Sequence, residues 1–487
     1  MFRVAVLSIC LFSFSAVFGQ YNRNGSQCCE ESCYSTDEQT QNTRFATKTA
    51  YEFIKGVRGD LYRVPHCEPI QFWLLTRHGT RLPSAKEIGR MPSLESIRDE
   101  VIRNYQERNS RLPDRGRLCF EDLENLSRWK WDHNITADHE QYLVYQGQED
   151  LRLLARRFQS KYPQLMDSLY NPKLYEFRHT DTQRTEYSFK AFAEGLFGPS
   201  SAAIHLPPPP KEDTLLKGYD FCPLYDKETE KPIIEHDAFE NSPIYNKLIE
   251  DVSTKLGFRF TLDKNVINDI WSMCRYDRAW KLDRLGSPWC AAFTQNQVKV
   301  LEYLEDLKYY YKTGYGINVN TKIGCPPIKD MIDKFTRKID TNDGPNVIAY
   351  FTHQAMLNLM LTTMGLAKDY KPLTAADYEN NANRQWRSSK QSPFTGNLAA
   401  VLHKCDETQA DRYQVLFLLN EAPAEISDCR VGLCTWETVR RKWALLADNC
   451  NLRNYCLPNA AHTINNNVLG FVLAATACFL VGRFRGM

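Results

Sequence analysis

The chain has 487 residues, of which 43% are hydrophobic and 25% are charged, and its formal net charge is +2. This composition is that of a globular protein and excludes a disordered chain. So small a net charge gives no overall field that would recruit nucleic acid or anionic lipid, so an anion site would have to come from a local cluster of basic residues.

The first segment is typical of a secretory signal peptide. Arg3 precedes an apolar run from Val4 to Phe18, and the residues before Gln20 include several small ones. We therefore expect residues 1–19 to be removed and the mature chain to enter the secretory pathway. In such a chain each Asn-x-Ser/Thr sequon is a predicted glycosylation site, and these are Asn24, Asn125 and Asn134.

Three short apolar runs predict buried β-strands. Residues 70–76 (IQFWLLT) end at the polar segment 77–79 (RHG), and residues 347–352 (VIAYFT) end at His353. Residues 413–419 (YQVLFLL) form the third run. Runs of this length that end abruptly at polar residues favour strands that lead into loops.

A fourth strand is predicted at residues 174–178. It leads into residues 180–182 (TDT), which are good helix-capping residues, and then into a helix with Phe189, Phe192 and Leu196 on one side. Strands that alternate with helices predict an α/β protein with a Rossmann-like mixed sheet core and flanking helices. Ligands of such sheets lie at the carboxyl ends of the strands, where His78, Arg184 and His353 would meet.

Four consecutive prolines, at residues 207–210, mark a boundary, since they fit neither a helix nor a central strand. Three amphipathic stretches follow, at residues 245–256, 266–280 and 295–311. They predict a helical cap inserted into the sheet domain. The predicted division is 43–206 for the first part of the core, 207–340 for the cap and 341–456 for the second part of the core.

The cysteine count favours disulfides. Of 16 cysteines, Cys10 lies in the expected signal peptide and Cys478 in the last segment, which leaves an even number in an oxidising compartment. No histidine stands at zinc-finger spacing near the remaining cysteine clusters. We therefore expect disulfide bridges and no metal site.

The last segment favours a lipid anchor. Residues 468–482 are apolar, yet they fall short of the roughly twenty residues that a membrane-spanning helix needs. Asn459 and two alanines stand before a polar spacer, the order of a GPI-attachment signal. We expect attachment at Asn459, removal of residues 460–487 and a place on the extracellular face of the plasma membrane. A short membrane anchor, secretion and the endoplasmic reticulum lumen are the alternatives.

The segment Arg77-His78-Gly79-Thr80-Arg81 carries the strongest chemical signal. Positive charge on both sides of His78 disfavours the imidazolium form, so the ring stays neutral and nucleophilic. The two guanidiniums can hold phosphate oxygens, and Gly79 allows a close approach of the backbone. Taken alone, an Arg-His-Gly triplet is more often a surface turn, so the prediction depends on the residues that join it.

Two residues from other segments join it. Arg184 is predicted in the first turn of a helix and would add a third guanidinium beside the positive end of that helix. His353, at the end of a predicted strand, could stabilise the equatorial oxygens of a phosphate, although a histidine there is often only structural. Together these residues predict a clamp that presents a phosphate to His78.

Residues 77–83 (RHGTRLP) resemble the R-H-G-x-R-x-P signature of the two-branch histidine phosphatases, which include phytases and acid phosphatases. Further segments resemble the multiple inositol polyphosphate phosphatases of that group: 287–294 (SPWCAAFT), 302–316 (EYLEDLKYYYKTGYG), 392–397 (SPFTGN) and 418–423 (LLNEAP). The resemblance extends from about residue 43 to about residue 456.

The resemblance implies a histidine phosphatase fold and metal-free hydrolysis of phosphomonoesters without a cofactor. It implies that His78 forms a phosphohistidine and that Arg77, Arg81, Arg184 and His353 hold the phosphate. Substrates of the family are inositol hexakisphosphate and lower inositol polyphosphates, and some members also act on 2,3-bisphosphoglycerate. Lys86 could contact further phosphates or could be a solvated surface lysine.

One departure from the family pattern concerns the proton donor. In the family an acid follows the second histidine, as H-D or H-A-E, whereas this chain has His353-Gln354-Ala355. A positioned general acid contributes about 10² to 10⁴ in rate. Three interpretations follow: a phosphatase that takes its proton from Asp181 or a neighbouring substrate phosphate, which we favour; a pseudophosphatase that only binds inositol polyphosphates; and an enzyme for substrates with acidic leaving groups.

Overall fold

The computed structural model describes residues 30–37, 39–56, 63–107, 112, 115–283, 286–407 and 411–457. The expected signal peptide, Asn24, Asn459 and the segment 460–487 lie outside these residues. Within the described part of the chain, no helix is both long and apolar enough to cross a membrane.

A seven-stranded mixed sheet forms the centre of the fold, in the order β4-β5-β2-β6-β7-β8 with β9 paired to β7. Its strands are β2 (Cys67–Arg77), β4 (Tyr175–His179), β5 (Val347–Thr352), β6 (Asn397–Cys405), β7 (Tyr413–Leu419), β8 (Ala422–Pro423) and β9 (Leu433–Thr435). β4, β5 and β2 are parallel, and β6 is antiparallel to both of its neighbours. The predicted α/β class and the four predicted strands are confirmed.

β6 is the longest of the strands that periodicity did not predict. It lies between β2 and β7, and all of its residues are buried except Lys404. Its sequence (NLAAVLHKC) contains two alanines and several polar residues, which have low strand propensity. Pairing on both sides therefore determines this strand more than its own sequence does.

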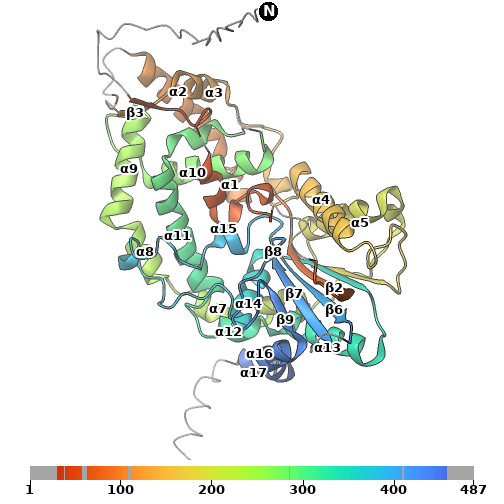
Figure 1. The fold of residues 1–487 in the computed structure, drawn as a ribbon. Helices are drawn as coiled ribbons and strands as arrows, with labels where there is room; N and C mark the ends of the chain where they lie inside the picture. The colour runs from red at the N-terminus through yellow and green to blue at the C-terminus, as the bar shows by residue number, and fades with distance from the viewer. Residues whose placement is uncertain are drawn as a thin grey trace, which may run out of the picture.

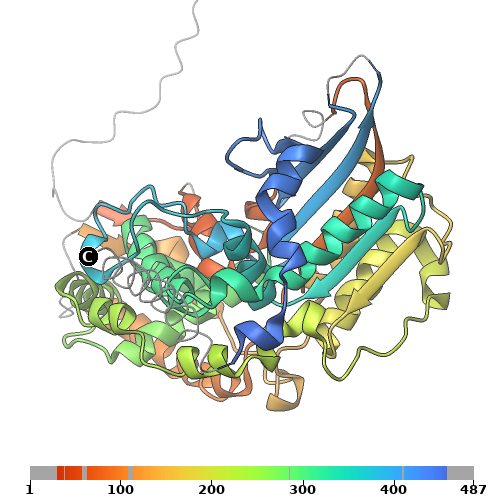
Figure 2. The same cartoon turned by 90° about the horizontal axis from the view of Figure 1, so that it is seen from below.

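Helices cover both faces of the sheet. Successive β2 side chains point to opposite faces, so that Phe72 and Leu74 enter one apolar cluster while Trp73 and Leu75 enter another. Figure 2 shows the resulting layers, with helices on either side of the strands. The first face is covered by α4 (Tyr145–Lys161) and α5 (Gln183–Phe197), and the second by α13 (Cys325–Thr341), α14 (Gln354–Met364) and α16 (Trp436–Asp448).

A mainly helical region stands beside the sheet (Figure 1). The three helices predicted for the cap are confirmed as α9 (Pro243–Lys255), α10 (Lys264–Trp280) and α11 (Gln295–Thr313). Their apolar cluster also takes in α2 (Leu94–Gln106) and α3 (Phe120–Arg128). α2 and α3 precede the predicted boundary at 206, and α13, which precedes the boundary at 340, packs on the sheet. The packing therefore draws segments from both sides of these boundaries.

The remaining elements are short. They are α1 (Ala85–Ile88), α6 (Thr214–Lys217), α7 (Pro223–Thr229), α8 (Ile234–Glu240), α12 (Asn320–Ile323), α15 (Ser388–Gln391), α17 (Leu452–Tyr455), β1 (Glu30–Ser32) and β3 (Arg115–Leu118). The two short strands pair in parallel and form a separate sheet.

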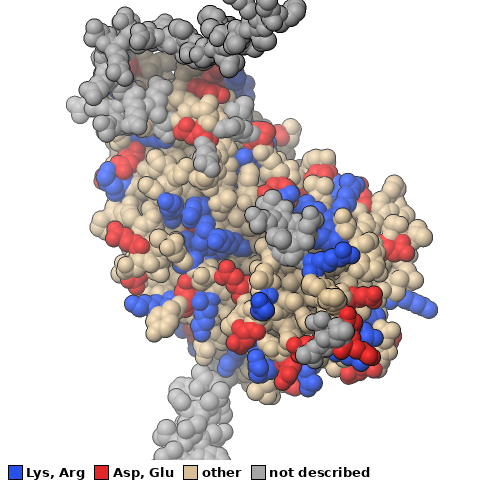
Figure 3. Space-filling model, in the orientation of Figure 1, with Lys and Arg blue, Asp and Glu red and all other residues tan. Residues whose placement is uncertain are grey.

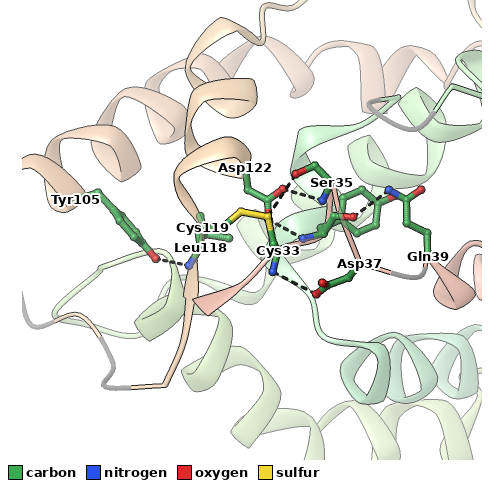
Figure 4. Close-up of a disulfide and its surroundings, with 9 residues drawn as sticks. Cys33, Ser35, Asp37, Gln39, Tyr105, Leu118, Cys119 and Asp122 are labelled. Carbon is green, nitrogen blue, oxygen red and sulfur yellow. Dashed lines mark hydrogen bonds between the residues drawn. A yellow bond between two sulfur atoms is a disulfide. The ribbon is translucent and has the colours of Figure 1, made fainter. Parts of the chain in front are cut away.

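Six disulfides join described residues, as the cysteine count predicts: Cys33–Cys119, Cys67–Cys405, Cys222–Cys456, Cys274–Cys290, Cys325–Cys450 and Cys429–Cys434. In the first of these bridges, shown in Figure 4, Asp122 lies beside the sulfur atoms and accepts hydrogen bonds from the backbone N–H groups of Tyr34 and Ser35. Cys33, Cys119 and Asp122 are close enough to suggest a metal site. Because both sulfurs are bonded to each other, however, no thiolate is left to bind an ion.

Candidate active site

The two histidines lie at the carboxyl edge of the parallel strands, as predicted. Arg77 at the end of β2 is paired with Thr352 at the end of β5, so His78 and His353 leave the sheet side by side. Their ring centroids are 5.7 Å apart. The backbone N–H of His78 donates to the Thr352 carbonyl oxygen at 2.9 Å, which fixes the start of the loop.

The ring of His78 is held in the nucleophilic tautomer. Its Nδ1 lies 2.8 Å from the carbonyl oxygen of Gly79. A carbonyl can only accept, so Nδ1 carries the proton and Nε2 carries the free lone pair. Burial, followed by the charges of Arg77 and Arg184, holds the pKa of His78 well below its ordinary value. The structure thus supports a neutral His78 beside arginines, as the sequence indicates.

His353 is neutral for similar reasons. Burial and then the charge of Arg184 hold its pKa well below the ordinary value. Arg184 Nη2 lies 3.3 Å from His353 Nδ1, and because a guanidinium only donates, Nδ1 accepts this hydrogen bond. The Nε2–H then donates to the Thr180 hydroxyl at 2.9 Å. Arg184 and His353 therefore hold each other at the same edge of the pocket.

The arginines retain unused donors. Arg77 Nη1 donates to the carbonyl oxygens of Thr47 and Ser392, and its guanidinium lies 4.5 Å from the centre of the Phe394 ring. The Nε atoms of Arg77 and Arg184 are buried without a protein acceptor. Burial and then the charge of Arg81 lower the pKa to about 9 for Arg77 and to about 10 for Arg184. A bound anion would satisfy these donors and relieve the repulsion between them.

These side chains surround a pocket of about 350 Å³. Its lining is strongly basic, whereas residues of both charge signs occur on the face of the molecule shown in Figure 3. Uncharged lining residues include Thr47, Gln141, Thr182, Tyr219, Tyr309, His78, His353, Gln354 and Ala355. The charged lining residues are five cations and one carboxylate, namely Lys48, Arg77, Arg81, Arg184, Lys217 and Asp220. Such a pocket fits an anion that carries several charges.

The structure brings together most of the predicted site residues. Arg77, His78, Arg81, Arg184 and His353 all line the pocket. By contrast, Lys86 on α1 and Asp181 before α5 are exposed and are not among the residues that line it. Of the predicted glycosylation sites, Asn134 is exposed and Asn125 on α3 is half-buried.

Three charged residues of the pocket were not predicted from the sequence. Lys48 ends the short helix η2 (Ala46–Lys48), and Lys217 ends α6. Asp220 follows in the helix η8 (Gly218–Phe221). None of these three residues stands in a recognisable motif. They reach His78 only through the folding of the chain, so the sequence carries no local signal for them. Burial and then the charge of Arg275 lower the pKa of Lys48 to about 8.

Residues 70–420 match the histidine phosphatase superfamily (branch 2), and the chain belongs to this family. It is 41% identical over 455 residues to the multiple inositol polyphosphate phosphatase 1 of Drosophila melanogaster, covering 93% of this chain and 96% of that one. The corresponding Homo sapiens protein is 29% identical over 441 residues, covering 85% and 88%.

Two solved structures share the fold. A phytase from D. castellii has a TM-score of 0.67 at 16% identity and covers 86% of this chain and 87% of its own. The Bifidobacterium longum multiple inositol polyphosphate phosphatase in complex with inositol hexasulfate has a TM-score of 0.58 at 14% identity, with coverage of 80% and 94%. Together with the family match, they confirm the histidine phosphatase fold.

Proposed function

We propose that this protein hydrolyses inositol polyphosphates, from inositol hexakisphosphate downward, through a phosphohistidine on His78. The observation that carries the proposal is the free Nε2 lone pair of His78 in a pocket whose guanidiniums have unsatisfied donors. The name of the Drosophila melanogaster relative supports the substrate class.

In this proposal the arginines position the phosphate. Arg77, Arg81 and Arg184 hold its oxygens, and His353 donates to one of them, while Nε2 of His78 attacks phosphorus from the side opposite the leaving oxygen. The Thr180 hydroxyl can either donate or accept, so His353 can exchange its Nε2 proton for one on Nδ1 when a phosphate arrives. The pocket thereby adapts to its ligand without moving the backbone.

Further cations explain why the substrate would carry several phosphates. Lys48 and Lys217 line the pocket in addition to the three arginines. One phosphomonoester cannot satisfy five cations, whereas an inositol ring with phosphates on neighbouring carbons can contact all of them. The same argument extends to 2,3-bisphosphoglycerate, which carries two phosphates and a carboxylate.

A second candidate function is binding without efficient cleavage. Gln354 and Ala355 line the pocket where the family has its acid, and neither residue can give up a proton. The Gln354 amide instead donates to the Thr313 hydroxyl at 3.4 Å. A pocket that keeps its phosphate ligands and loses its acid would retain inositol polyphosphates at the cell surface.

Phosphate release separates these two functions. The mature chain and its His78→Ala variant are incubated with inositol hexakisphosphate from acidic to neutral pH, and binding of the same ligand is measured by calorimetry. Release that His78→Ala abolishes, with binding retained, supports the enzyme. Binding by the wild-type chain without release supports the receptor, and release that survives His78→Ala excludes His78 as the nucleophile.

The disulfides support a place outside the cytosol. Six bridges in the described residues require an oxidising compartment. We further propose the GPI anchor at Asn459, which the sequence favours. Treatment of intact cells with a phosphatidylinositol-specific phospholipase C would release a GPI-linked protein into the medium, whereas a protein with a membrane-spanning anchor would stay on the cells.

A further inference from the structure

We propose that Asp220 protonates the departing inositol oxygen and so replaces the acid that the family carries after its second histidine. The inference rests on the proposed function, since it concerns the same reaction. Among the described residues that line the pocket, Asp220 alone has a carboxyl group.

The position of Asp220 suits this role. It belongs to η8, which packs against α14. Gln354 and Ala355 form the first turn of α14 and line the same pocket as Asp220. A carboxyl from η8 thus lines the same pocket as the first turn of α14, which carries the acid of the H-A-E motif in the family. Its side chain is 38% exposed, so water can return a proton to it after each turnover.

Lys217 connects Asp220 to the phosphate clamp. Its Nζ lies 2.6 Å from Asp220 Oδ2. Lys217 also lies near His353, because its charge is among those that lower the pKa of that ring. The lysine therefore pairs with the carboxylate on the side of the pocket where His353 stands.

A polyphosphate would change this pairing. Once a substrate phosphate takes Lys217 as its partner, Asp220 loses its counter-charge and gains anionic neighbours. Both changes favour the protonated carboxylic acid, because a nearby negative charge disfavours ionisation. Binding of the substrate would thus promote protonation of the carboxyl group that its own cleavage requires.

Other groups in the pocket are less suited. Burial raises the pKa of Tyr219 well above its ordinary value, so its hydroxyl is a weak acid. Lys48 has a lowered pKa of about 8, but its Nζ lies 3.8 Å from the Glu87 carboxylate, which favours the charged ammonium. Lys48 remains the rival donor that the experiment must separate from Asp220.

The step balances in protons and charge. The Nε2 lone pair of His78 forms the N–P bond while the P–O bond to inositol breaks, and the Asp220 proton passes to the departing oxygen. Asp220, now a carboxylate, then takes a proton from the water that attacks the phosphohistidine. Phosphate leaves, His78 is neutral again and Asp220 is reloaded.

The test compares two substrates with different leaving groups. Inositol hexakisphosphate leaves as an alkoxide that needs a proton, whereas p-nitrophenyl phosphate leaves as a stabilised phenolate that needs none. We expect Asp220→Asn to lower kcat on inositol hexakisphosphate by about 10² to 10⁴, with a loss on p-nitrophenyl phosphate at least tenfold smaller. Asp220→Glu should keep part of the activity, and Asp226→Asn, an exposed aspartate on α7, serves as the matched control.

Each outcome separates the inference from the proposed function. A wild-type chain that cleaves neither substrate defeats the proposed function itself. Suppose that the wild type cleaves both substrates. If Asp220→Asn then keeps the wild-type rates, or loses rate equally on both substrates, Asp220 is not the proton donor, although the proposed phosphatase activity is upheld. A leaving-group-dependent loss in Lys48→Met, with none in Asp220→Asn, would transfer the role to Lys48.

Discussion

Gly79 and Gly147 touch through their backbones beneath the nucleophile loop. A Cβ atom on Gly79 would lie 2.4 Å from the carbonyl oxygen of Gly147, and one on Gly147 would lie 2.2 Å from that of Thr80. Both separations are far below van der Waals contact. Helix α4, which carries Gly147, therefore supports the loop of His78 at a distance that no side chain permits.

Gly147→Ala should displace this loop. Because the added methyl would overlap the Thr80 backbone, we expect a loss of about 1–3 kcal/mol in the free energy of unfolding and a larger relative loss of kcat on inositol hexakisphosphate. Urea unfolding and phosphate release measure the two effects. Gly89→Ala is the control, since its Cβ would meet its nearest atom at 3.5 Å. Full activity in Gly147→Ala would show that the loop does not depend on this contact.

Asp150 on the same helix should make stability depend on pH. It accepts a hydrogen bond from Thr80, and burial raises its pKa to about 7. The folded state thus holds the proton more tightly than the unfolded state, so this contribution is complete below about pH 4 and is lost as pH rises to about 7.

The Asp150→Asn variant tests this dependence. In the wild type we expect Asp150 to lower the free energy of unfolding by roughly 1–4 kcal/mol as pH rises from 4 to 7, and the variant should lack this contribution. Burial also raises the pKa of Asp277 to about 7, so this residue should maintain a pH dependence of the same sign in the variant. Urea unfolding across this range measures the slope, and an identical slope in the variant contradicts the role of Asp150.

Ala355→Glu should restore the acid of the family. Ala355 lines the pocket in the first turn of α14, where a carboxylate is also favoured by the helix dipole. In the Asp220→Asn background, which lacks the proposed donor, we expect this carboxyl to raise kcat on inositol hexakisphosphate by up to about 10², with little change in binding. Ala355→Gln has nearly the same shape without the proton and should give no gain. Equal rates in these two variants would count against a general acid at this position.

Arg81→Ala should weaken ligand binding. Arg81 Nη1 donates to the Leu82 carbonyl oxygen at 2.6 Å, which holds the guanidinium in the pocket lining. Charge-assisted hydrogen bonds contribute about 1.5–3 kcal/mol each, so the Kd for inositol hexakisphosphate should rise by about 10- to 100-fold. Calorimetry in the His78→Ala background avoids turnover, and Arg103→Ala on the exposed side of α2 is the control. An unchanged Kd would remove Arg81 from the phosphate clamp.

Local patterns predicted the parts of the fold that depend on short segments. The runs at 347–352 and 413–419 coincide with β5 and β7, because continuous apolar residues suit interior strands. β6 escaped prediction because the alanines and polar residues of its sequence have low strand propensity. Arg77, His78 and Arg81 could be predicted to line one pocket for the same local reason, since all three stand in one motif.

The rest of the pocket depends on topology. Lys48 lies thirty positions before His78 in sequence, and Lys217 and Asp220 follow the proline run. Their approach to the histidines requires the path of the whole chain, which periodicity cannot give. The absence of the family's acid could be read from the sequence. The carboxyl of Asp220, the only one among the described lining residues, could be placed in the pocket only from the structure.

The bridge between Cys222 and Cys456 extends the active site to the far end of the described chain. Cys222 follows η8 directly, and its partner lies 234 positions later. The two cysteines share a small apolar cluster with Leu359 of α14. A truncation that removed Cys456 would therefore leave a free thiol next to the wall that carries Lys217 and Asp220. The segment around Cys456 thus supports the wall of the pocket that carries Lys217 and Asp220.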